Sequence, residues 1–371
     1  MLAIQDIENL FKNTLTNETL SGIYLPLNNN PSFLEYNDVT AIMIVKKDEN
    51  NKSCPVAFGE TQKITNNQYY AMINIVDEEY LCQYVSVNHN KTFRECWNNK
   101  NLSILSLNNT NLFSNNLNND NNNSISLPFS TYIIPYYTVF GDKQIKPLLE
   151  ILFEETIKKL NIYNNFYVNK NMTIDIIYEG NIIKREEEEG ILRNFVGFNV
   201  IDKMYIQKCT YNVESLKEFI EDCNEYYINN DCIEIDKSNL QMVTEYDKMI
   251  IGMERKDYLK HLFKLGNVEG LVQINDKGIV DGYILKMNNH IIGCYGKNEK
   301  IQINLIKSLL SKFDDTTEIT FFINCQENFI TTKLLRNALE LNEVRRLHTS
   351  TLINKINWEK VGIIGIGCHV F

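Results

Sequence analysis

The chain has 371 residues, of which 44% are hydrophobic, and its formal net charge is −10 at pH 7. This length is too great for one ordinary core and suits two domains. The acidic excess argues against nucleic acid as a partner, because affinity for phosphates comes from clustered Lys and Arg. No run approaches the ~20 consecutive apolar residues of a membrane-spanning helix, so we expect no membrane partner.

The N-terminus carries neither the basic flank nor the apolar core of a secretory signal. The nine cysteines are irregularly spaced and form no CxxC pair, which is typical of reduced thiols in a cytosolic protein. The five histidines show no metal-binding spacing such as HxxxH. We therefore expect a cytoplasmic protein without a metal site.

The first half of the sequence alternates strand and helix signals, as in an α/β fold. A helix is expected to begin near Pro147, where a missing N–H costs nothing, with Leu148, Leu149, Leu152 and Phe153 on its apolar stripe. A second, acidic helix is expected over residues 186–195, followed by a turn at Gly197. The strand candidates are rich in β-branched and aromatic residues and cover residues 39–46, 55–62, 131–139, 172–178 and 203–208.

Asparagine dominates residues 98–124. Such a segment holds too little apolar surface to offset the entropy lost on ordering. We expect a disordered insertion on the surface, between two strands of the first sheet.

The second half repeats this order of elements without repeating the sequence. A linker over residues 210–232 carries a helix at 215–227. At the C-terminal strand, Trp358, Ile363 and Ile364 should be buried and residues 354–357 exposed. The remaining signals are a short strand at 233–235, a helix at 246–265, strands within 270–293, a helix at 302–313, a strand at 318–324 and a helix at 331–341. The pattern predicts two tandem domains, 1–209 and 233–371, each a mixed, mostly antiparallel sheet flanked by helices.

Short motifs in both halves resemble one family. The second half carries Tyr246-Asp247, Gly252-Met253-Glu254-Arg255 and Trp358-Glu359-Lys360-Val361, and the first half has a strand hairpin and a Gly197-Phe198 turn after a helix. Together they resemble two-domain proteins of the GNAT (N-acetyltransferase) superfamily, whose C-terminal domain is acetyltransferase-like. The resemblance implies a splayed strand that pairs with acetyl-CoA, and a loop that holds the pyrophosphate at a helix N-terminus.

The resemblance assigns the splayed strand to residues 131–139. Two residues are candidates for catalysis: Glu60 as a general base, and Tyr137 as an acid or part of the acetyl pocket. An exposed strand glutamate and a core aromatic are the plainer interpretations of these two residues. The residues implied in binding the cofactor are Thr138, Val139, Gly141, Asp142, Lys143 and Gln144.

The sequence also departs from the family pattern. The loop has one glycine with Asp142 beside it, and Arg193 stands where many members have a tyrosine that serves as general acid. Two functions therefore stay open. One is acetyl transfer from acetyl-CoA to an amine of a small molecule or protein, and the other is a catalytically inert GNAT-like binding protein. Arg345 and Arg346 are interpreted as the exposed start of a strand.

Overall fold

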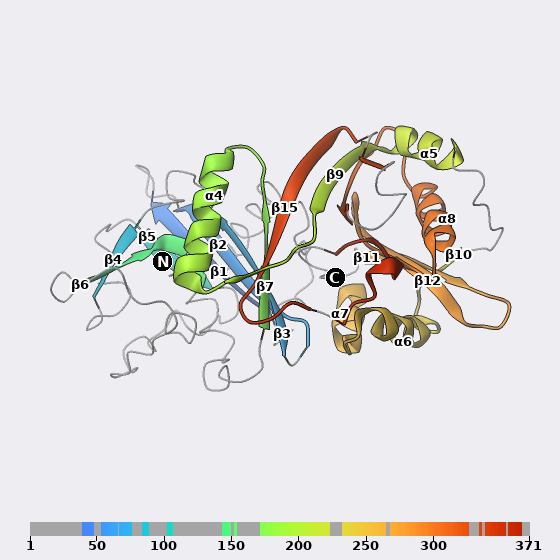
Figure 1. Ribbon diagram of the computed structural model, residues 1–371, viewed down its shortest axis with the longest axis horizontal. Coiled ribbons are helices and arrows are strands. Elements are labelled where there is room, and N and C mark those ends of the chain that lie inside the picture. The colour runs from blue at the N-terminus through green and yellow to red at the C-terminus, as the bar shows by residue number, and fades with distance from the viewer. Residues whose placement is uncertain are drawn as a thin grey trace.

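The structure is a computed structural model of the whole chain. It describes residues 39–47, 53–65, 67–75, 84–88, 102–106, 143–149, 152–153, 171–222, 232–264, 268–325, 334–335, 338–353 and 355–365. The described residues are mixed α/β, with helices packed on an extended sheet (Figure 1).

Strands from both halves of the chain join one 14-stranded sheet. The strands of the first half are β1 (Val39–Lys47), β2 (Ser53–Lys63), β3 (Gln68–Ile75), β5 (Leu102–Ser106) and β7 (Asn171–Ile177). Those of the second half are β10 (Cys232–Glu234), β11 (Val268–Ile274), β12 (Val280–Met287), β13 (His290–Gly296), β14 (Glu318–Asn324) and β16 (Val361–Ile363). The connecting strands are β8 (Val200–Ile201), β9 (Ile206–Asn212) and β15 (Glu340–His348).

From either edge of the sheet, three antiparallel pairs of strands are followed by one parallel pair. The order of strands is β10-β11-β12-β13-β14-β9-β15-β7-β3-β2-β1-β5, with β16 attached to β13 and β8 to β15. The two halves of the chain are joined at the centre of the sheet. There, β9 pairs with β14 of the second half, and β15 pairs with β7 of the first half. The sequence boundary after residue 209 thus falls inside β9. Separation into two domains stays a prediction, while the mixed sheet is confirmed.

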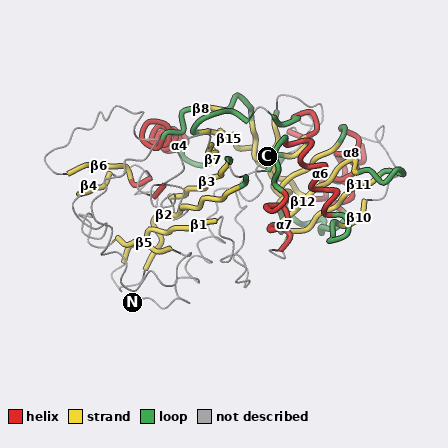
Figure 2. The backbone as a smooth tube through the Cα atoms, turned by 90° about the horizontal axis from the view of Figure 1, so that it is seen from below, coloured by secondary structure: helices red, strands yellow, loops and turns green. Residues whose placement is uncertain are grey.

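Helices cover both faces of the second half. α6 (Leu240–Ile251) and α7 (Lys256–Lys264) lie on one face, and α5 (Val213–Asp222) and α8 (Glu299–Leu310) on the other (Figures 1 and 2). Each layer has its own apolar core. The core beneath α6 and α7 also includes Tyr70 and Met72 of β3, so it continues into the first half.

In the first half, α4 (Ile182–Ile191) continues as the π-helical segment η6 (Leu192–Val196). Gly197 ends it in a left-handed conformation with φ of 99°, which confirms the predicted turn. The apolar stripe after Pro147 is also confirmed at residues 148, 149, 152 and 153, which are helical and fully buried. The rings of Phe153 and Phe198 pack edge to face, with their centroids 5.3 Å apart.

Several boundaries differ from the sequence predictions. The helix expected over 246–265 is two helices, because Gly252 adopts φ of 71° and ends α6. The strand expected from Lys203 begins at Ile206, and the helix expected up to residue 341 gives way to β15 at Glu340. Strand β5 pairs with β1 inside the segment 98–124, so disorder was the wrong expectation for Leu102–Ser106.

The burial of Ile363 and Ile364 is confirmed, since both are fully buried. Trp358 is only partly buried, and Ile356, expected to be exposed, is 7% exposed because it packs into the core beneath α6 and α7. The expectation for Arg346 was wrong: it lies inside β15 and is 1% exposed. A charge inside a sheet requires a partner, and that partner lies at the point where two central strands separate.

Candidate functional site

The strands β3 and β7 run parallel and then separate. Their ladder begins at Gln68 and Asn171 and ends at Ala71 and Ile174. Beyond that pair, residues 72–75 of β3 pair only with β2, and residues 175–177 of β7 only with β15, within the described part of the chain. We call these two facing edges the β3–β7 fork. Among the described strands none pairs with these two edges, and unpaired main-chain N–H and C=O groups are the groups that another extended chain can pair with.

A buried ion pair lies at the apex of the β3–β7 fork. Arg346 of β15 binds Asp175 of β7 through two hydrogen bonds, from Nε to Oδ1 and from Nη2 to Oδ2, each 2.8 Å long. Both side chains are 1% exposed. The Tyr70 hydroxyl of β3 donates to Asp175 Oδ2 at 2.8 Å, and Arg346 Nη2 donates to the Gly365 carbonyl at 3.1 Å. Burial alone would lower the pKa of Arg346, but the charge of Asp175 raises it above its ordinary value.

A second polar row runs beside this ion pair. Asn171 Nδ2 donates to Gln68 Oε1 at 3.1 Å, and Gln68 Nε2 donates to the Thr173 hydroxyl oxygen at 2.9 Å. Thr173 Oγ1 lies 2.8 Å from His348 Nδ1, and His348 Nε2 lies 3.3 Å from Asp202 Oδ2. The row therefore joins β3 to β7 and β15, and ends at a partly exposed carboxylate.

The charge of Asp202 fixes the proton positions in this row. Burial would raise the pKa of Asp202, but hydrogen bonds from His348 and the Met204 amide hold it below its ordinary value. An ionised Asp202 accepts a hydrogen bond from His348 Nε2–H, so Nδ1 of the neutral ring accepts from the Thr173 hydroxyl. The hydrogen bonds that link the members of the row then all run toward Asp202. Thr173 is fully buried, so the row resembles a nucleophilic triad in composition but offers substrate no nucleophile.

One predicted catalytic residue, Glu60, lies in β2, which pairs with β3 along the edge opposite the β3–β7 fork, and its catalytic role stays a prediction. The main chain of Glu60 pairs with Met72, the first residue of β3 beyond the apex. Lys143 and Gln144 lie in β6 (Lys143–Pro147), which pairs with β4 (Tyr84–Asn88) directly before the buried helix. They were expected in a loop and are found in a strand. Their role in cofactor binding stays a prediction.

The other predicted site residues lie outside the described residues, as does the expected splayed strand at 131–139. They are Tyr137, Thr138, Val139, Gly141 and Asp142. Among the described strands, the parallel pair that separates in the first half is β3 and β7.

The sequence interpretation missed the apex residues. Asp175 is the one charged residue of β7, and Arg346 lies in a strand whose last residues are buried. A single charge in an otherwise apolar strand needs an opposite charge nearby. That rule could have suggested Asp175 and Arg346 as partners, although their separation in the sequence hides the contact.

Within the described ranges, no group of three or more His, Cys, Asp or Glu side chains could hold a metal ion. None of the described helices is both long and apolar enough to cross a membrane.

Comparisons with known proteins give weak likenesses. A family model described as "Domain of unknown function (DUF7596)" matches residues 26–200, which include both strands of the β3–β7 fork. A search of the curated proteins found no match. A candidate acetyltransferase from Pyrococcus horikoshii is 12% identical with a TM-score of 0.48, covering 99% of this chain and 92% of that one.

Two further solved structures are similar over parts of the chain. A GCN5-related N-acetyltransferase from Kribbella flavida is 6% identical with a TM-score of 0.30, covering 53% of this chain and 47% of that one. The Saccharomyces cerevisiae N-myristoyltransferase with bound myristoyl-CoA is 8% identical with a TM-score of 0.32, covering 58% and 61%.

Proposed function

We propose that the chain is a GNAT-type N-acyltransferase that moves the acetyl group of acetyl-CoA to an amine of a small molecule or protein. The observation that carries the proposal is the β3–β7 fork, where a parallel pair separates after Ala71 and Ile174. The pantetheine arm of acetyl-CoA is extended and contains amide groups. It can therefore pair with a free strand edge as a peptide does.

The reaction proposed at the fork is direct transfer. A neutral amine attacks the thioester carbonyl carbon, the carbon–sulfur bond breaks, and the thiolate leaves and is protonated. Glu60, beside Met72 at the start of the fork, would take the proton that the amine loses. Main-chain N–H groups of the fork would stabilise the negative charge that develops on the carbonyl oxygen.

The buried residues at the apex, Asp175, Arg346 and Tyr70, would hold the strands of the fork in position and would not react with substrate. Arg346 and Asp175 connect β15 to β7, and Tyr70 connects β3 to the same carboxylate. These bonds fix the strands where they part, which holds the free edges at a constant separation.

The pyrophosphate would bind near the helix that follows Pro147, because a helix N-terminus presents free N–H groups and the positive end of its dipole. The proposed contacts are those of Thr138, Val139, Gly141, Asp142, Lys143 and Gln144, with Tyr137 at the acetyl pocket. The proposed location is the cytoplasm, which the irregular spacing of the nine cysteines supports.

A second candidate function is a GNAT-like binding protein without catalysis. The observation that favours it is Arg193, which stands where many family members have a general-acid tyrosine and pairs with Glu189 at 3.3 Å. A guanidinium has no proton to give to a leaving thiolate at neutral pH. Under this alternative the fork would bind a ligand without turning it over.

The test combines binding and turnover. Calorimetry should show saturable binding of acetyl-CoA, and a thiol-release assay should detect free CoA with a panel of polyamines, lysine and peptide N-termini. Glu60→Gln should bind acetyl-CoA with an unchanged Kd but lose about 100-fold or more in kcat, as removal of a general base does. Glu186→Gln, on the exposed side of α4, is the matched control and should behave as wild type.

Each outcome separates the candidates. Binding together with thiol release supports the acyltransferase. Binding without release across the whole panel supports the binding protein. If wild type bound neither acetyl-CoA nor CoA, the proposed role of the β3–β7 fork would be wrong.

A further inference from the structure

The second half contains a matching fork, and the C-terminal strand fills it. β13 and β14 pair in parallel only at His290 and Thr320 within the described residues. β16 then pairs antiparallel with β13 at Cys294 and Tyr295. On its other side, Ile364 forms an antiparallel bridge with Phe322 of β14, and its N–H donates to the Phe322 carbonyl at 2.8 Å.

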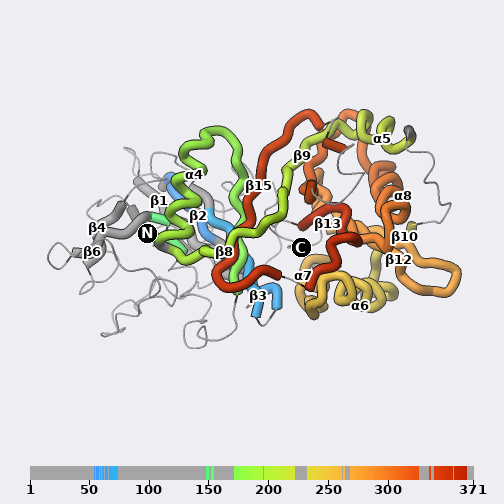
Figure 3. The backbone as a smooth tube through the Cα atoms, in the orientation of Figure 1, coloured from blue at the N-terminus to red at the C-terminus, as the bar shows by residue number. Residues whose placement is uncertain are grey.

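The position of β16 is fixed by what surrounds it. The outer edge of β13 is already paired with β12, and the outer edge of β14 with β9. A strand that pairs with both β13 and β14 must therefore lie between them. Figure 3 shows the segment that contains β16, in red, folded back beside β13.

β16 completes both apolar layers of the second half. Val361 and Ile364 join the core beneath α6 and α7, whereas Ile363 joins the core beneath α8. Two successive residues of β13 face Val361 and Ile363, so Gly362 is the extra residue of a β-bulge. The bulge turns Val361 and Ile363 to opposite faces, and an interior strand with apolar residues on both faces fits this position.

Glycine at position 362 is required by a close neighbour. A Cβ atom there would lie 2.8 Å from Oε1 and 3.0 Å from Cδ of Gln302. Gln302 is 1% exposed on α8, and its Nε2 donates to the Gly296 carbonyl at 3.5 Å. A larger residue at 362 must displace a buried side chain. The bulge position therefore selects for glycine.

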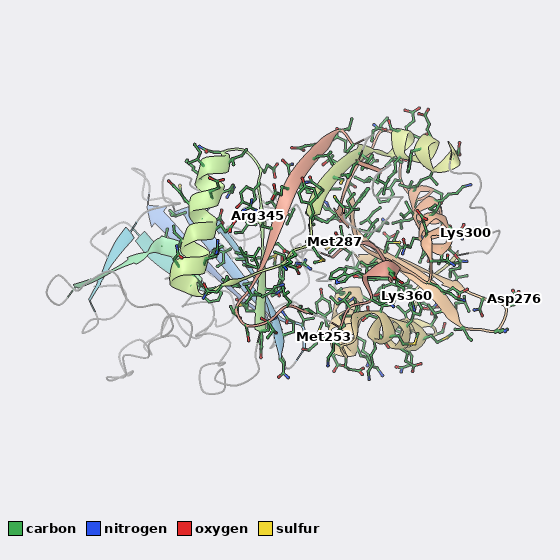
Figure 4. All side chains as sticks on the ribbon, in the orientation of Figure 1. Met253, Asp276, Met287, Lys300, Arg345 and Lys360 are labelled. Atoms are coloured by element: carbon green, nitrogen blue, oxygen red, sulfur yellow. The ribbon has the colours of Figure 1, made fainter. Side chains whose placement is uncertain are left out.

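The same fork is poorly suited to a CoA phosphate. The side chain of Asn298 caps α8 by accepting from the Ile301 N–H at 3.1 Å. Glu299 follows in the first turn and places a carboxylate where a pyrophosphate would bind. Figure 4 marks Lys300 on this turn of α8 and Lys360 at the start of the C-terminal segment.

We infer that the β13–β14 fork is a binding site for an extended peptide strand, filled in this chain by its own residues 361–364. Its ligand is an apolar peptide with glycine at the bulge, held by main-chain pairing on both edges and by side chains that enter both cores. This inference does not depend on the proposed acyltransferase activity.

The experiment separates the strand from its site. A chain ending at Lys360 is mixed, under reducing conditions and without acetyl-CoA, with a fluorescein-labelled synthetic peptide of residues 361–371. Fluorescence anisotropy should show saturable 1:1 binding to the truncated chain and at least tenfold weaker binding to the intact chain, whose site is filled. The peptide carrying Gly362→Val is the matched control and should bind at least tenfold more weakly.

The inference can still be tested if the truncated chain does not fold. If the truncated chain is not folded by circular dichroism, it is refolded from urea with either peptide, and recovery of native signal with the wild-type peptide alone supports the inference. No recovery with the wild-type peptide would overturn it. Equal binding of the two peptides, or equal binding by intact and truncated chains, would also overturn it.

Discussion

Breaking the ion pair between Asp175 and Arg346 should destabilise the protein far more than replacing both residues. The Asp175 carboxylate accepts hydrogen bonds from two nitrogens of Arg346 and from Tyr70, and both charged side chains are 1% exposed. Asp175→Asn leaves the guanidinium buried without its counter-charge. The cost expected for an uncompensated buried charge is about 3–5 kcal/mol.

The double variant Asp175→Leu with Arg346→Met removes both charges and keeps most of the volume. Its free energy of unfolding should lie within about 2 kcal/mol of wild type, because replacing a whole buried pair by apolar residues is often close to neutral. Urea denaturation followed by circular dichroism measures these variants together with the single variants Asp175→Leu and Arg346→Met, which complete the double-mutant cycle that gives the coupling energy.

A surface ion pair provides the control. Lys248 and Glu254 approach to 2.5 Å, but each side chain is 58% exposed. Their coupling energy should not exceed about 1 kcal/mol. Equal coupling energies for the exposed and buried pairs would refute the reasoning, as would a double variant as unstable as Asp175→Asn.

Three other predictions concern pH, backbone strain and the phosphate site. Burial, followed by the charge of Lys208, lowers the pKa of His290 to about 4. Between about pH 6.5 and 4, His290 therefore binds a proton in the unfolded chain but not in the folded one. As the pH falls through this window, the free energy of unfolding should decrease by up to about 3 kcal/mol. Urea titrations at several pH values should show this slope reduced in His290→Gln, and an unchanged slope would contradict it. Gly252→Ala should cost more than Gly278→Ala in thermal melts: both glycines have positive φ, but only Gly252 has a neighbour, Lys355 Cβ, at 2.6 Å from the added Cβ. Equal losses would show that the contact does not matter. Lys143→Glu should weaken CoA binding by about 1–2 kcal/mol, and Asp142→Gly should strengthen it. Calorimetry at fixed ionic strength checks both signs, and wild-type affinity in Lys143→Glu would rule this position out.

The sequence predicted the elements that depend on local patterns. The stripe after Pro147 is apolar at helical spacing, and four of its residues are buried in a helix. The hairpin of β1 and β2 was predicted from two apolar runs with a polar turn, and the strands pair antiparallel as expected. Gly197 marks the end of a helix because glycine reaches positive φ without strain.

Features that join distant segments could not be predicted in the same way. Strand β15 pairs with both β7 and β9, and nothing in its local composition identifies these partners. The fork at β3 and β7 depends on where a ladder ends, which is a property of two strands about a hundred residues apart. The C-terminal strand was correctly expected to be buried, yet its place between β13 and β14 is visible only in the pairing of Ile363 and Ile364.

Amide hydrogen exchange with and without acetyl-CoA tests the central claim most directly, because it reports where the ligand pairs with the main chain. Exchange should slow along residues 72–75 of β3 when acetyl-CoA is added. Residues 291–295 of β13, already paired with β16 at Cys294 and Tyr295, should be unchanged. Protection confined to the second half, or no change in either fork at a saturating concentration of acetyl-CoA, would contradict the assignment of the β3–β7 fork as the acyl-CoA site.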